Sequence, residues 1–585
     1  MKIRAKVTAC NVVNVVRLVV ANLRDEPSYF FLQVIRKFKG SASGHLSDCL
    51  KLMPVSRVKS MSIRCILSDR SSDLDAVVKE WLASNAVTTD GFLLADVCIA
   101  MYRWDLAEEV LSCLPNGQRA TRRKARLQWH FGDLRGALEL LETIPASRQQ
   151  KHYLSEYRTL SGTSPSLRSR LPSNLRVQVT PKSVLYFATN SLPNTGSGYA
   201  QRTHSILRSL IPFGWSPLAV TRALYPVSVG HVLAPEVETV DAIAYRRIFP
   251  FPARHDLSGR LQQQTDELFK ITSDLQPQIL HTTTDYTNAL SVSVVARELR
   301  IPWVYEVRGQ LADTWASTRG PEAKNSERYS LFVQREAEMA RGADFVITLG
   351  EEMRSNLIAA GVSEDRIAIL PNAVGERFLS DPVPRHEARR ILGLEQEAFF
   401  IGTISSIVPY EGLDTVLKAI SLVRDQISQL RLLIVGDGTD LENLKKLASD
   451  LEIENICVFT GRVPREKAHL YHAALNAFVV PRKDLDVTRS VTPLKPVEAL
   501  ASRVPVLASD LPALRELITN GENGHLIPPE DPIAWSEAIV DAANQPELLE
   551  SMGQRGREMV LNTRTWDANA RRLVEIYEQV TKESR

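Results

Sequence analysis

The chain has 585 residues, of which 44% are hydrophobic and 24% are charged, and its formal net charge is +3. This length exceeds what one hydrophobic core supports, so about three or four domains are expected. The near balance of charge gives no global field that would attract nucleic acid. Six cysteines without a CxxC pair indicate neither a zinc site nor a disulfide framework, and a reducing cytosol is the simplest interpretation.

Residues 1–160 carry the apolar spacing of helices. Within them, segment 104–115 resembles segment 132–145, since each has an Asp near a helix start, Ala and Leu at helical spacing, and Pro after the end. The offset is close to the tetratricopeptide period but below it. We predict a small helical-hairpin domain similar to tetratricopeptide repeats. It is either a surface for a protein partner or for self-association, or an extra structural lobe.

Residues 7–23 are rich in valine, but Asn11, Asn14 and Arg17 interrupt the apolar run. We expect this segment to be too short and too polar to span a membrane. Because basic residues follow closely, a helix lying on a membrane surface is one interpretation. A helix packed on its own domain is the favoured one. We therefore expect a cytoplasmic protein, with a peripheral position at the inner face of the membrane as the alternative.

Residues 161–182 are rich in Ser, Pro and Arg and lack an apolar period, which indicates a linker. Beyond it, short apolar runs alternate with helical segments. The expected strands are 183–188, 216–220, 278–282, 302–307 and 345–349 in one set, and 399–404, 430–436, 456–459, 477–481 and 504–508 in a second.

This alternation predicts two Rossmann-like, doubly wound parallel sheets, one over residues 183–385 and one over 386–565, with a final helix over 566–585. Two such α/β domains in tandem form a cleft between their sheet ends, and ligands of open α/β folds bind there.

The first expected strand is followed by a glycine-rich stretch that opens a helix. Gly196 and Gly198 lack side chains, so backbone N–H groups there can approach an anion closely. A plain tight turn is the alternative. Arg202 lies on the first turns of the same helix and faces either the cleft or the surface.

Two further residues end expected strands of the first domain. His281 is either a site residue at the strand end or a structural histidine. Arg308 has a planar guanidinium that suits an anion in the cleft. The alternative for Arg308 is a buried pair with Glu306 or Asp313.

The second domain repeats this placement of loops after strands. Ser-Ser-Ile-Val-Pro-Tyr-Glu-Gly-Leu-Asp follows its first strand at 405–414, Gly436 and Gly438 follow the second, and Thr-Gly-Arg-Val follows the third at 460–463. The two glycines are either part of the site or only turn residues.

The most informative stretch is 479–528. An apolar strand gives way to a loop, and a Thr-Pro-Leu-Lys turn at 492–495 opens a short helix that carries Glu498. A helix N-terminus attracts an anion, and a carboxylate just inside the helix accepts hydrogen bonds from ribose hydroxyls. This combination is the chemistry of a nucleotide-sugar site.

With these motifs the chain resembles the family-4 retaining glycosyltransferases, which have the GT-B fold. Their pattern has two glutamates with seven residues between them. Glu498 matches the second glutamate, and Ser490 stands at the position of the first. The Tyr-Glu-Gly-Leu-Asp motif at 410–414 and the Thr-Pro-Leu-Lys-Pro motif at 492–496 are similar to one subgroup. The resemblance covers about residues 183–580 and leaves residues 1–180 outside.

The resemblance implies retaining transfer of a hexose from a UDP- or GDP-sugar to an acceptor hydroxyl, in cell-surface polysaccharide or glycolipid synthesis. Most of the family uses an arginine and a lysine to stabilise the departing nucleoside diphosphate, but Ser406 and Glu411 stand at those positions. Other cations must then serve, with Lys495 foremost and Arg308 and Arg482 behind it. Glu411 could instead pair with one of these cations.

The resemblance also implies the remaining site residues. The predicted donor-binding residues are Gly196, Gly198, Ser406, Gly436, Arg462, Val463, Thr492, Pro493, Leu494 and Glu498. Arg202 and His281 are predicted on the acceptor side. The Asp-Leu-Asp at 484–486 falls in the donor loop and is treated as a chance match to a metal motif. We therefore expect neither a metal nor a cofactor besides the nucleotide-sugar substrate.

Two alternatives remain at this point. One is a sugar-nucleotide epimerase on the same fold, for which the chain offers few carboxylates and histidines in fitting places. The other is a catalytically degenerate GT-B scaffold that works as a binding protein through its helical domain. The missing first glutamate and the missing cation pair are the best support for the second.

Overall fold

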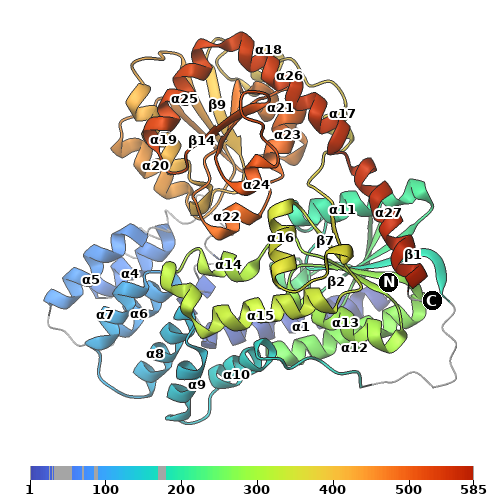
Figure 1. The fold of residues 1–585 in the computed structure, drawn as a ribbon. Helices are drawn as coiled ribbons and strands as arrows, with labels where there is room; N and C mark the ends of the chain where they lie inside the picture. Colours follow the sequence, from blue (N-terminus) through green and yellow to red (C-terminus); the bar gives the residue numbers. More distant parts are fainter. Residues whose placement is uncertain are drawn as a thin grey trace.

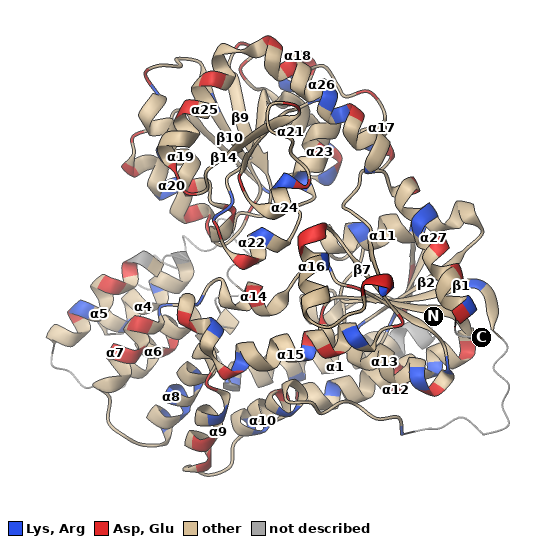
Figure 2. Cartoon of the chain, viewed as in Figure 1, with Lys and Arg blue, Asp and Glu red and all other residues tan. Residues whose placement is uncertain are grey.

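The chain folds into a helical lobe and two α/β domains stacked on each other (Figure 1). The computed structural model describes residues 2–25, 27–28, 30–31, 34, 56–68, 71–84, 90–168 and 179–583. The predicted fold class is confirmed, because helices precede two Rossmann-like domains built on parallel sheets. Charges of both signs are scattered over all three parts (Figure 2), in keeping with the small net charge.

The first α/β domain is built on a sheet of strand order β3-β4-β2-β1-β5-β6-β7-β8, in which only β3 runs antiparallel to its neighbour among the described strands. Its strands are β1 (Thr180–Ala188), β2 (Ser216–Thr221), β3 (Val237–Val240), β4 (Ile243–Arg247), β5 (Pro277–Thr283), β6 (Trp303–Glu306), β7 (Phe345–Thr348) and β8 (Ile367–Ile369). Its main helices are α11 (Gly198–Leu210), α12 (Leu257–Leu275), α13 (Tyr286–Leu299), α14 (Leu311–Ala316), α15 (Glu327–Gly342) and α16 (Glu351–Ala359).

The second α/β domain has the parallel strand order β11-β10-β9-β12-β13-β14. The strands are β9 (Phe399–Ile404), β10 (Leu430–Val435), β11 (Cys457–Gly461), β12 (Ala477–Val480), β13 (Val506–Ser509) and β14 (Gly524–Ile527). The helices are α17 (Glu376–Leu379), α18 (Arg385–Leu392), α19 (Leu413–Val423), α20 (Leu441–Asp450), α21 (Ala468–Ala474), α22 (Asp486–Ser490), α23 (Lys495–Ala501), α24 (Pro512–Arg515), α25 (Pro532–Asn544) and α26 (Pro546–Thr563).

Four strands escaped the sequence analysis, namely β3, β4, β8 and β14. Each has three to five residues, and β3 at the sheet edge alternates between exposed and half-buried positions. Strands of this length carry too few apolar residues to stand out from loops by periodicity. The longer strands in the middle of each sheet are mostly buried and were predicted.

The last helix, α27 (Trp566–Glu583), returns from the second domain to the first (Figure 1). Leu573, Ile576, Tyr577 and Val580 of α27 join a buried cluster with strand residues of the first sheet. The final helix predicted over 566–585 is confirmed, and its crossing fixes the second domain against the first.

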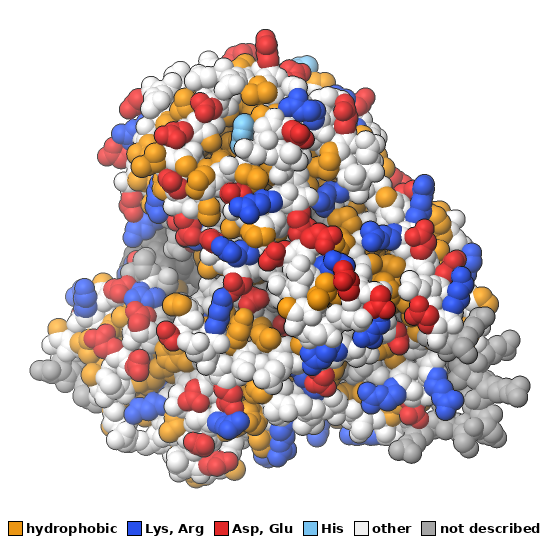
Figure 3. Space-filling model, in the orientation of Figure 1, with side chains coloured by type: hydrophobic (Ala, Val, Ile, Leu, Met, Phe, Trp, Pro, Cys, Tyr) orange, Lys and Arg blue, Asp and Glu red, His pale blue; other side chains and the backbone are white. Residues whose placement is uncertain are grey.

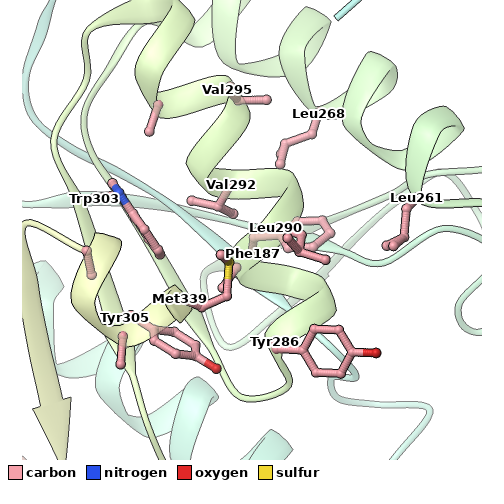
Figure 4. Packing of buried hydrophobic residues seen from close by; sticks show 14 of the residues in the cluster. Phe187, Leu261, Leu268, Tyr286, Leu290, Val292, Val295, Trp303, Tyr305 and Met339 are labelled. Carbon is pink, nitrogen blue, oxygen red and sulfur yellow. The ribbon is translucent and has the colours of Figure 1, made fainter. Parts of the chain in front are cut away.

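The helical lobe is divided between two hydrophobic cores. Helices α4 (Arg57–Ser68), α5 (Leu74–Ala83), α6 (Asp90–Ala100) and α7 (Trp104–Ser112) form a core of their own. Helices α8 (Gln118–Phe131), α9 (Leu134–Glu142) and α10 (Arg148–Leu160) instead share the core that lies beneath the first sheet. Figure 4 shows part of this shared core, where Phe187, Leu290 and Met339 meet. The lobe is therefore anchored to the first α/β domain.

Helix α1 (Lys2–Asp25) packs against the first α/β domain, and its end also borders the helical lobe. Asn14 lies against the first α/β domain, where its amide donates to the carbonyl of Pro250 at 2.9 Å and accepts from the N–H of Ala253 at 3.1 Å. By length and composition, the window Val7–Arg24 is long and apolar enough to cross a membrane. The expectation that this segment is too short and too polar to span one is therefore not supported.

The structure describes part of the predicted linker. Residues 169–178 of it lie outside the described chain, and β1 already begins at Thr180. Upstream, the guanidinium of Arg335 donates to the carbonyl of Thr163 and to the hydroxyl of Ser164. The first part of the linker thus rests on α15.

The contact between α27 and the first sheet gives a stability prediction. The hydroxyl of Tyr577 lies 2.6 Å from Nδ1 of the fully buried His281. Burial lowers the pKa of His281 to about 3, so the ring is neutral at pH 7. Replacing Tyr577 by Phe leaves a buried nitrogen unpaired, and we expect the free energy of unfolding in urea to fall by about 1–2 kcal/mol.

The matched control is Tyr157→Phe, which removes a hydroxyl bonded to the exposed Arg135. This control should change the free energy of unfolding by less than about 0.5 kcal/mol. Equal effects of the two substitutions would contradict the role given to the Tyr577–His281 contact.

Candidate active site

Two cavities lie between the α/β domains, at the carboxyl ends of both parallel sheets. The larger has a volume of about 850 Å³ and is lined by residues 195–198, Gly436 and α23. The smaller measures about 580 Å³ and is lined by the loops after β1, β5, β6, β9 and β12. Figure 3 shows charged side chains of both signs gathered along this boundary between the domains. Ligands of open α/β folds bind at this edge of the sheet.

The two cavities meet at a shared wall. The residues that line both are Ser197, Gly198, Arg202, Ser405, Ser406, Leu494 and Lys495. The glycine-rich stretch, the loop after β9 and the start of α23 thus converge on one point. A ligand that extends from one cavity into the other must pass this junction.

The predicted donor residues divide between the cavities in an orderly way. Gly196, Gly436, Arg462, Val463 and Glu498 line the larger cavity. Thr492 and Pro493 line the smaller one, and Gly198, Ser406 and Leu494 line both. All ten predicted donor residues therefore lie on one continuous space.

Gly436 has a backbone reason to be glycine. Its φ is +144°, and a Cβ there would overlap the carbonyl oxygen of Ser405. The loops after β9 and β10 pack backbone to backbone at this point, so a side chain is excluded. Gly438 lines neither cavity, and its part is that of a turn residue.

Glu498 and Lys495 form an ion pair at the mouth of the larger cavity. Lys495 Nζ lies 2.7 Å from Glu498 Oε2, and His472 Nε2 lies 3.4 Å from the same oxygen. Burial acts to raise the pKa of Glu498, but Lys495 and His472 outweigh it and hold the pKa at about 2. The carboxylate is therefore anionic at any physiological pH. Burial also lowers the pKa of His472, which favours its neutral form.

Arg482 is the cation that pairs with Glu411, as one alternative from the sequence held. Its guanidinium binds the Glu411 carboxylate through Nε at 3.2 Å and through a terminal nitrogen at 3.0 Å, and it donates to the carbonyl of Val491 at 2.8 Å. Arg482 lines the smaller cavity. Its charge is nevertheless neutralised by a bidentate carboxylate partner.

Arg308 shows the buried pairing that was the alternative to a cleft role. It is 2% exposed, and it donates to the carboxylate of Glu306 at 2.5 Å and to the carbonyl of Tyr199 at 2.8 Å. Asp313 takes no part, since it accepts from the hydroxyl of Tyr329. Arg308 lines the smaller cavity, but its guanidinium is held by the protein.

Arg202 lies on the opposite side of the same carboxylate. It donates to Glu306 at 2.7 Å and to the carbonyls of Leu370 and Pro371 at 2.6 and 3.0 Å. Of the two alternatives from the sequence, the cleft fits and the surface does not, because Arg202 lines both cavities and is 2% exposed, and it also ties α11 to the segment between the domains. Burial acts to raise the pKa of Glu306, but Arg308 and Arg202 lower it well below its usual range.

The placement of His281 on the acceptor side is not supported. The side chain is fully buried, lines neither cavity, and bonds Tyr577 of α27. It ends a strand as expected, but its ring points into the layer between the sheet and α27. The structural alternative raised from the sequence is the one that the geometry favours.

Ser490, which stands where the first glutamate was expected, bridges the domains. Its hydroxyl accepts from the amide of Asn356 on α16 at 3.1 Å. Two further contacts cross the same boundary. The amide of Asn372 donates to the carbonyl of Thr492 at 2.8 Å, and the carboxylate of Glu516 accepts from the first backbone N–H groups of α16. The domains are thus held in a closed arrangement around the site.

Several site residues were missed by the sequence analysis. Arg377 and Arg465 bring two exposed cations to the larger cavity, and Trp566 closes one side of it. His472 reaches Glu498 from α21, which packs beside α23. No local motif marks these residues, because they come from four different segments that only the folded chain brings together.

Both aspartates of the Asp-Leu-Asp sequence at 484–486 form ion pairs. Asp484 binds Arg489, and Asp486 binds Lys324 across the domain boundary. Among the described residues, no group of three or more His, Cys, Asp or Glu side chains is arranged to hold a metal ion.

Comparison with known proteins agrees with this geometry. Residues 384–559 match the family model of glycosyl transferases group 1, and residues 197–373 match that of the glycosyl transferase 4-like domain. Both matches begin beyond α10, so the helical lobe lies outside them. The matched segments carry the two α/β domains and the cavities between them.

Among the relatives, the GDP-mannose-dependent alpha-(1-6)-phosphatidylinositol monomannoside mannosyltransferase of Mycolicibacterium smegmatis is 31% identical over 266 residues, which are 45% of this chain and 69% of that protein. The D-inositol 3-phosphate glycosyltransferase of Thermomonospora curvata is 26% identical over 59% of this chain and 83% of that protein. Sucrose-phosphate synthase of Thermosynechococcus elongatus superposes with a TM-score of 0.58 at 20% identity, covering 68% of this chain and 100% of that one.

The chain therefore belongs to the group 1 glycosyl transferases, a family of GT-B enzymes, and it is a glycosyltransferase.

The ion pair of Lys495 and Glu498 gives a prediction on acid stability. Because the pKa of Glu498 is lowered from 4.5 to about 2, its carboxylate stabilises the fold fully above pH 4.5 and loses that contribution as the pH falls towards 2. The substitution Glu498→Gln removes this pH-dependent contribution to the free energy of unfolding. Between about pH 5 and pH 2, the wild-type protein should lose about 2–3 kcal/mol more free energy of unfolding than the variant does.

The control is Glu442→Gln, which opens the exposed Glu442–Lys445 pair of the same spacing on α20. Its free energy of unfolding should follow the wild-type curve over the acid range. A Glu498→Gln curve parallel to the wild type would show that the carboxylate is not held anionic by its neighbours.

Proposed function

We propose that the chain transfers a hexose, with retention of anomeric configuration, from a UDP- or GDP-sugar to a hydroxyl of a lipid-linked or glycan acceptor. One observation carries the proposal. Lys495 stands at the junction of the two cavities, and its ion-pair partner Glu498 faces the larger one. A nucleotide in the larger cavity and an acceptor in the smaller one would bring the reacting bond to Lys495.

Glu498 is proposed to hold the ribose. Its carboxylate is anionic and buried beside Lys495 and His472, and a carboxylate accepts hydrogen bonds from two neighbouring hydroxyls at once. The loop at Val463 would lie against the base, as the family resemblance implies. Gly196 and Gly198 would leave room for the diphosphate beside the start of α11.

The proposed step balances within the two substrates. The bond between the anomeric carbon and the donor phosphate oxygen breaks, and the acceptor oxygen forms its bond on the same face of the sugar. The acceptor proton passes to the departing phosphate oxygen. No electron is exchanged with any other group. The developing charge on the diphosphate is what the protein must stabilise.

Lys495 is proposed to carry that stabilisation almost alone. Arg482 is neutralised by Glu411, and Arg308 by Glu306. Arg308 cannot turn to a phosphate without leaving the buried carboxylate of Glu306 unpaired, which is costly. Arg482 cannot do so without giving up its bidentate contact with the half-buried Glu411. Lys495 is bound to one carboxylate and its side chain is 37% exposed, so it can exchange Glu498 for phosphate when the ribose takes its place. Arg377 and Arg465 are available at the rim.

The same proposal gives a structural reason why the motifs Tyr-Glu-Gly-Leu-Asp and Thr-Pro-Leu-Lys-Pro occur together in this chain. Arg482 joins the two motifs, because it binds Glu411 on one side and the carbonyl of Val491 on the other. A glutamate at 411 would thus replace the usual lysine in order to hold the turn that presents Lys495. Arg482 therefore links Glu411, which stands where the family has a lysine, to the turn that carries Lys495.

A glycolipid acceptor is favoured by the relatives' names. They include the phosphatidylinositol monomannoside mannosyltransferase and an alpha-monoglucosyldiacylglycerol synthase of Streptococcus pneumoniae, the latter 26% identical over 50% of this chain and 68% of that protein. Each transfers a sugar to a lipid-linked acceptor by name. We propose the same class of acceptor here.

The first test separates donor binding from chemistry. Calorimetry with UDP, GDP and their sugars should identify one nucleotide that binds. Glu498→Ala should weaken it by about 10- to 100-fold, because charged hydrogen bonds are lost. Lys495→Ala should lower kcat by about 100-fold or more while the nucleotide still binds. Lys445→Ala, which opens the matched exposed pair, should change neither.

Two results would contradict this proposal. Unchanged nucleotide affinity in Glu498→Ala would place the ribose elsewhere. The absence of nucleotide binding together with the absence of turnover, across the panel and with lipid extracts as acceptor, would favour the degenerate scaffold.

The second test addresses the proposed independence from metal. Release of nucleoside diphosphate should proceed at an unchanged rate after treatment with a chelator, because Lys495 supplies the positive charge. Loss of turnover in the chelator, with recovery on adding magnesium or manganese, would overturn this part of the mechanism.

A further inference from the structure

Helix α1 presents its apolar side to solvent. Val12, Val13, Val16 and Val20 are 37–56% exposed, whereas Asn11 and Asn14 are 0–1% exposed. The Asn14 amide bonds the loop before α12, as described above, whereas the buried amide of Asn11 has no hydrogen-bond partner among the described residues. A helix that only packs on its own protein has the reverse pattern, with the apolar face inward. Something outside the chain is therefore expected to cover the valines.

The exposed valines form one stripe with a basic edge. At about 100° per residue, Val12, Val16, Val20 and Val13 span an arc of roughly 100°, and Arg24 and Arg17 follow at its border. Phe251, in the loop that Asn14 contacts, is 54% exposed beside α1. The first α/β domain thus adds an exposed aromatic side chain near α1.

A pocket rich in arginine lies at the end of this stripe. It has a volume of about 530 Å³ between α1, α6, α8 and α10, and six arginines line it together with one acidic residue, Asp96. The arginines are Arg24, Arg119, Arg122, Arg123, Arg126 and Arg148. Figure 2 marks basic residues in blue along α8.

The negative charge of Asp96 is neutralised by two of these arginines. Its carboxylate accepts from Arg123 at 2.6 Å and from Arg126 at 2.8 Å. Arg119, Arg122 and Arg148 are exposed, and their side chains form no ion pair within the described part of the chain. The pocket therefore keeps a local excess of positive charge although the whole chain carries only +3. Guanidinium groups gathered in this way suit phosphate oxygens.

The stripe and the pocket belong to one face of the molecule. Arg24 lies at the border of the valine stripe on α1 and also lines the pocket, so the two features adjoin. We call the valine stripe, Phe251 and the arginine pocket together the docking surface.

We propose that the docking surface seats the protein on a lipid bilayer that contains anionic phospholipids. The valines and Phe251 would enter the boundary between headgroups and acyl chains, and the pocket would take lipid phosphates. A second copy of the chain is a poorer fit, since it would bring the same uncompensated arginines against each other. The inference is independent of sugar transfer, and vesicle binding is measured without turnover.

The test is sedimentation of the full chain with vesicles of phosphatidylcholine alone and with one-third phosphatidylglycerol. The wild-type protein should bind the anionic vesicles at least about tenfold more tightly and should be released by high salt. Arg119→Glu with Arg122→Glu, and separately Val16→Asp, should each weaken that binding by about tenfold or more.

Matched controls on other faces should bind like the wild type. They are Arg571→Glu with Arg572→Glu on the exposed side of α27, and Val333→Asp on α15, where the valine is 40% exposed. Unchanged thermal midpoints of all variants would show that each still folds.

Four outcomes would overturn the proposal. They are equal or absent binding to both kinds of vesicle, full binding by both docking-surface variants, retention after high salt and alkaline carbonate (which would mean a spanning helix), and binding of inorganic pyrophosphate without binding of vesicles. The last would leave the pocket as a site for a soluble phosphate compound. A dimer in sedimentation that Val16→Asp dissolves, with no vesicle binding, would assign the stripe to self-association.

Discussion

The carboxylate of Glu306 is the contact on which the site depends. It ends β6 with no solvent exposure and lies between Arg202 and Arg308. A buried charge is costly unless it is paired and hydrogen-bonded, so the positions of both arginines are fixed by it. Arg202 also holds the carbonyls of the segment between the domains, where Asn372 binds the donor turn through the carbonyl of Thr492. One buried anion thus sets the glycine-rich stretch, the interdomain segment and the donor turn relative to each other.

This constraint explains how the protein can work without the usual pair of cations. The family's arginine and lysine positions hold Ser406 and Glu411, and the glutamate is joined to the donor turn by Arg482. Positive charge near the proposed leaving group is thereby concentrated on Lys495, whose one described partner is Glu498. The arginines that looked most suitable by residue type serve as structural ties. Catalysis by a single movable cation within a rigid frame is the consequence that we propose.

Features encoded by consecutive residues could be predicted from the sequence, whereas contacts between distant segments could not. Long central strands, the Thr-Pro-Leu-Lys turn and Glu498 could be predicted, because each is encoded by consecutive residues. The roles of Arg202 and His281 could not be predicted, because their partners Glu306 and Tyr577 lie far away in the sequence and no local pattern indicates these contacts. His472 reaches Glu498 from another helix. Helix α1 was interpreted from its average polarity, whereas the proposed docking depends on which side of the helix carries the valines.

A crystal structure of the chain with UDP or GDP is the most direct test of the account, which requires the nucleotide to span from the larger cavity to the junction. The prediction is that both ribose hydroxyls bind the Glu498 carboxylate, that the diphosphate lies between Gly198 and Lys495, and that Lys495 has left Glu498 for a phosphate oxygen. Arg308 and Arg482 should keep their present partners. A diphosphate bound instead by Arg308 or Arg482, with the Lys495–Glu498 pair intact, would contradict the central claim.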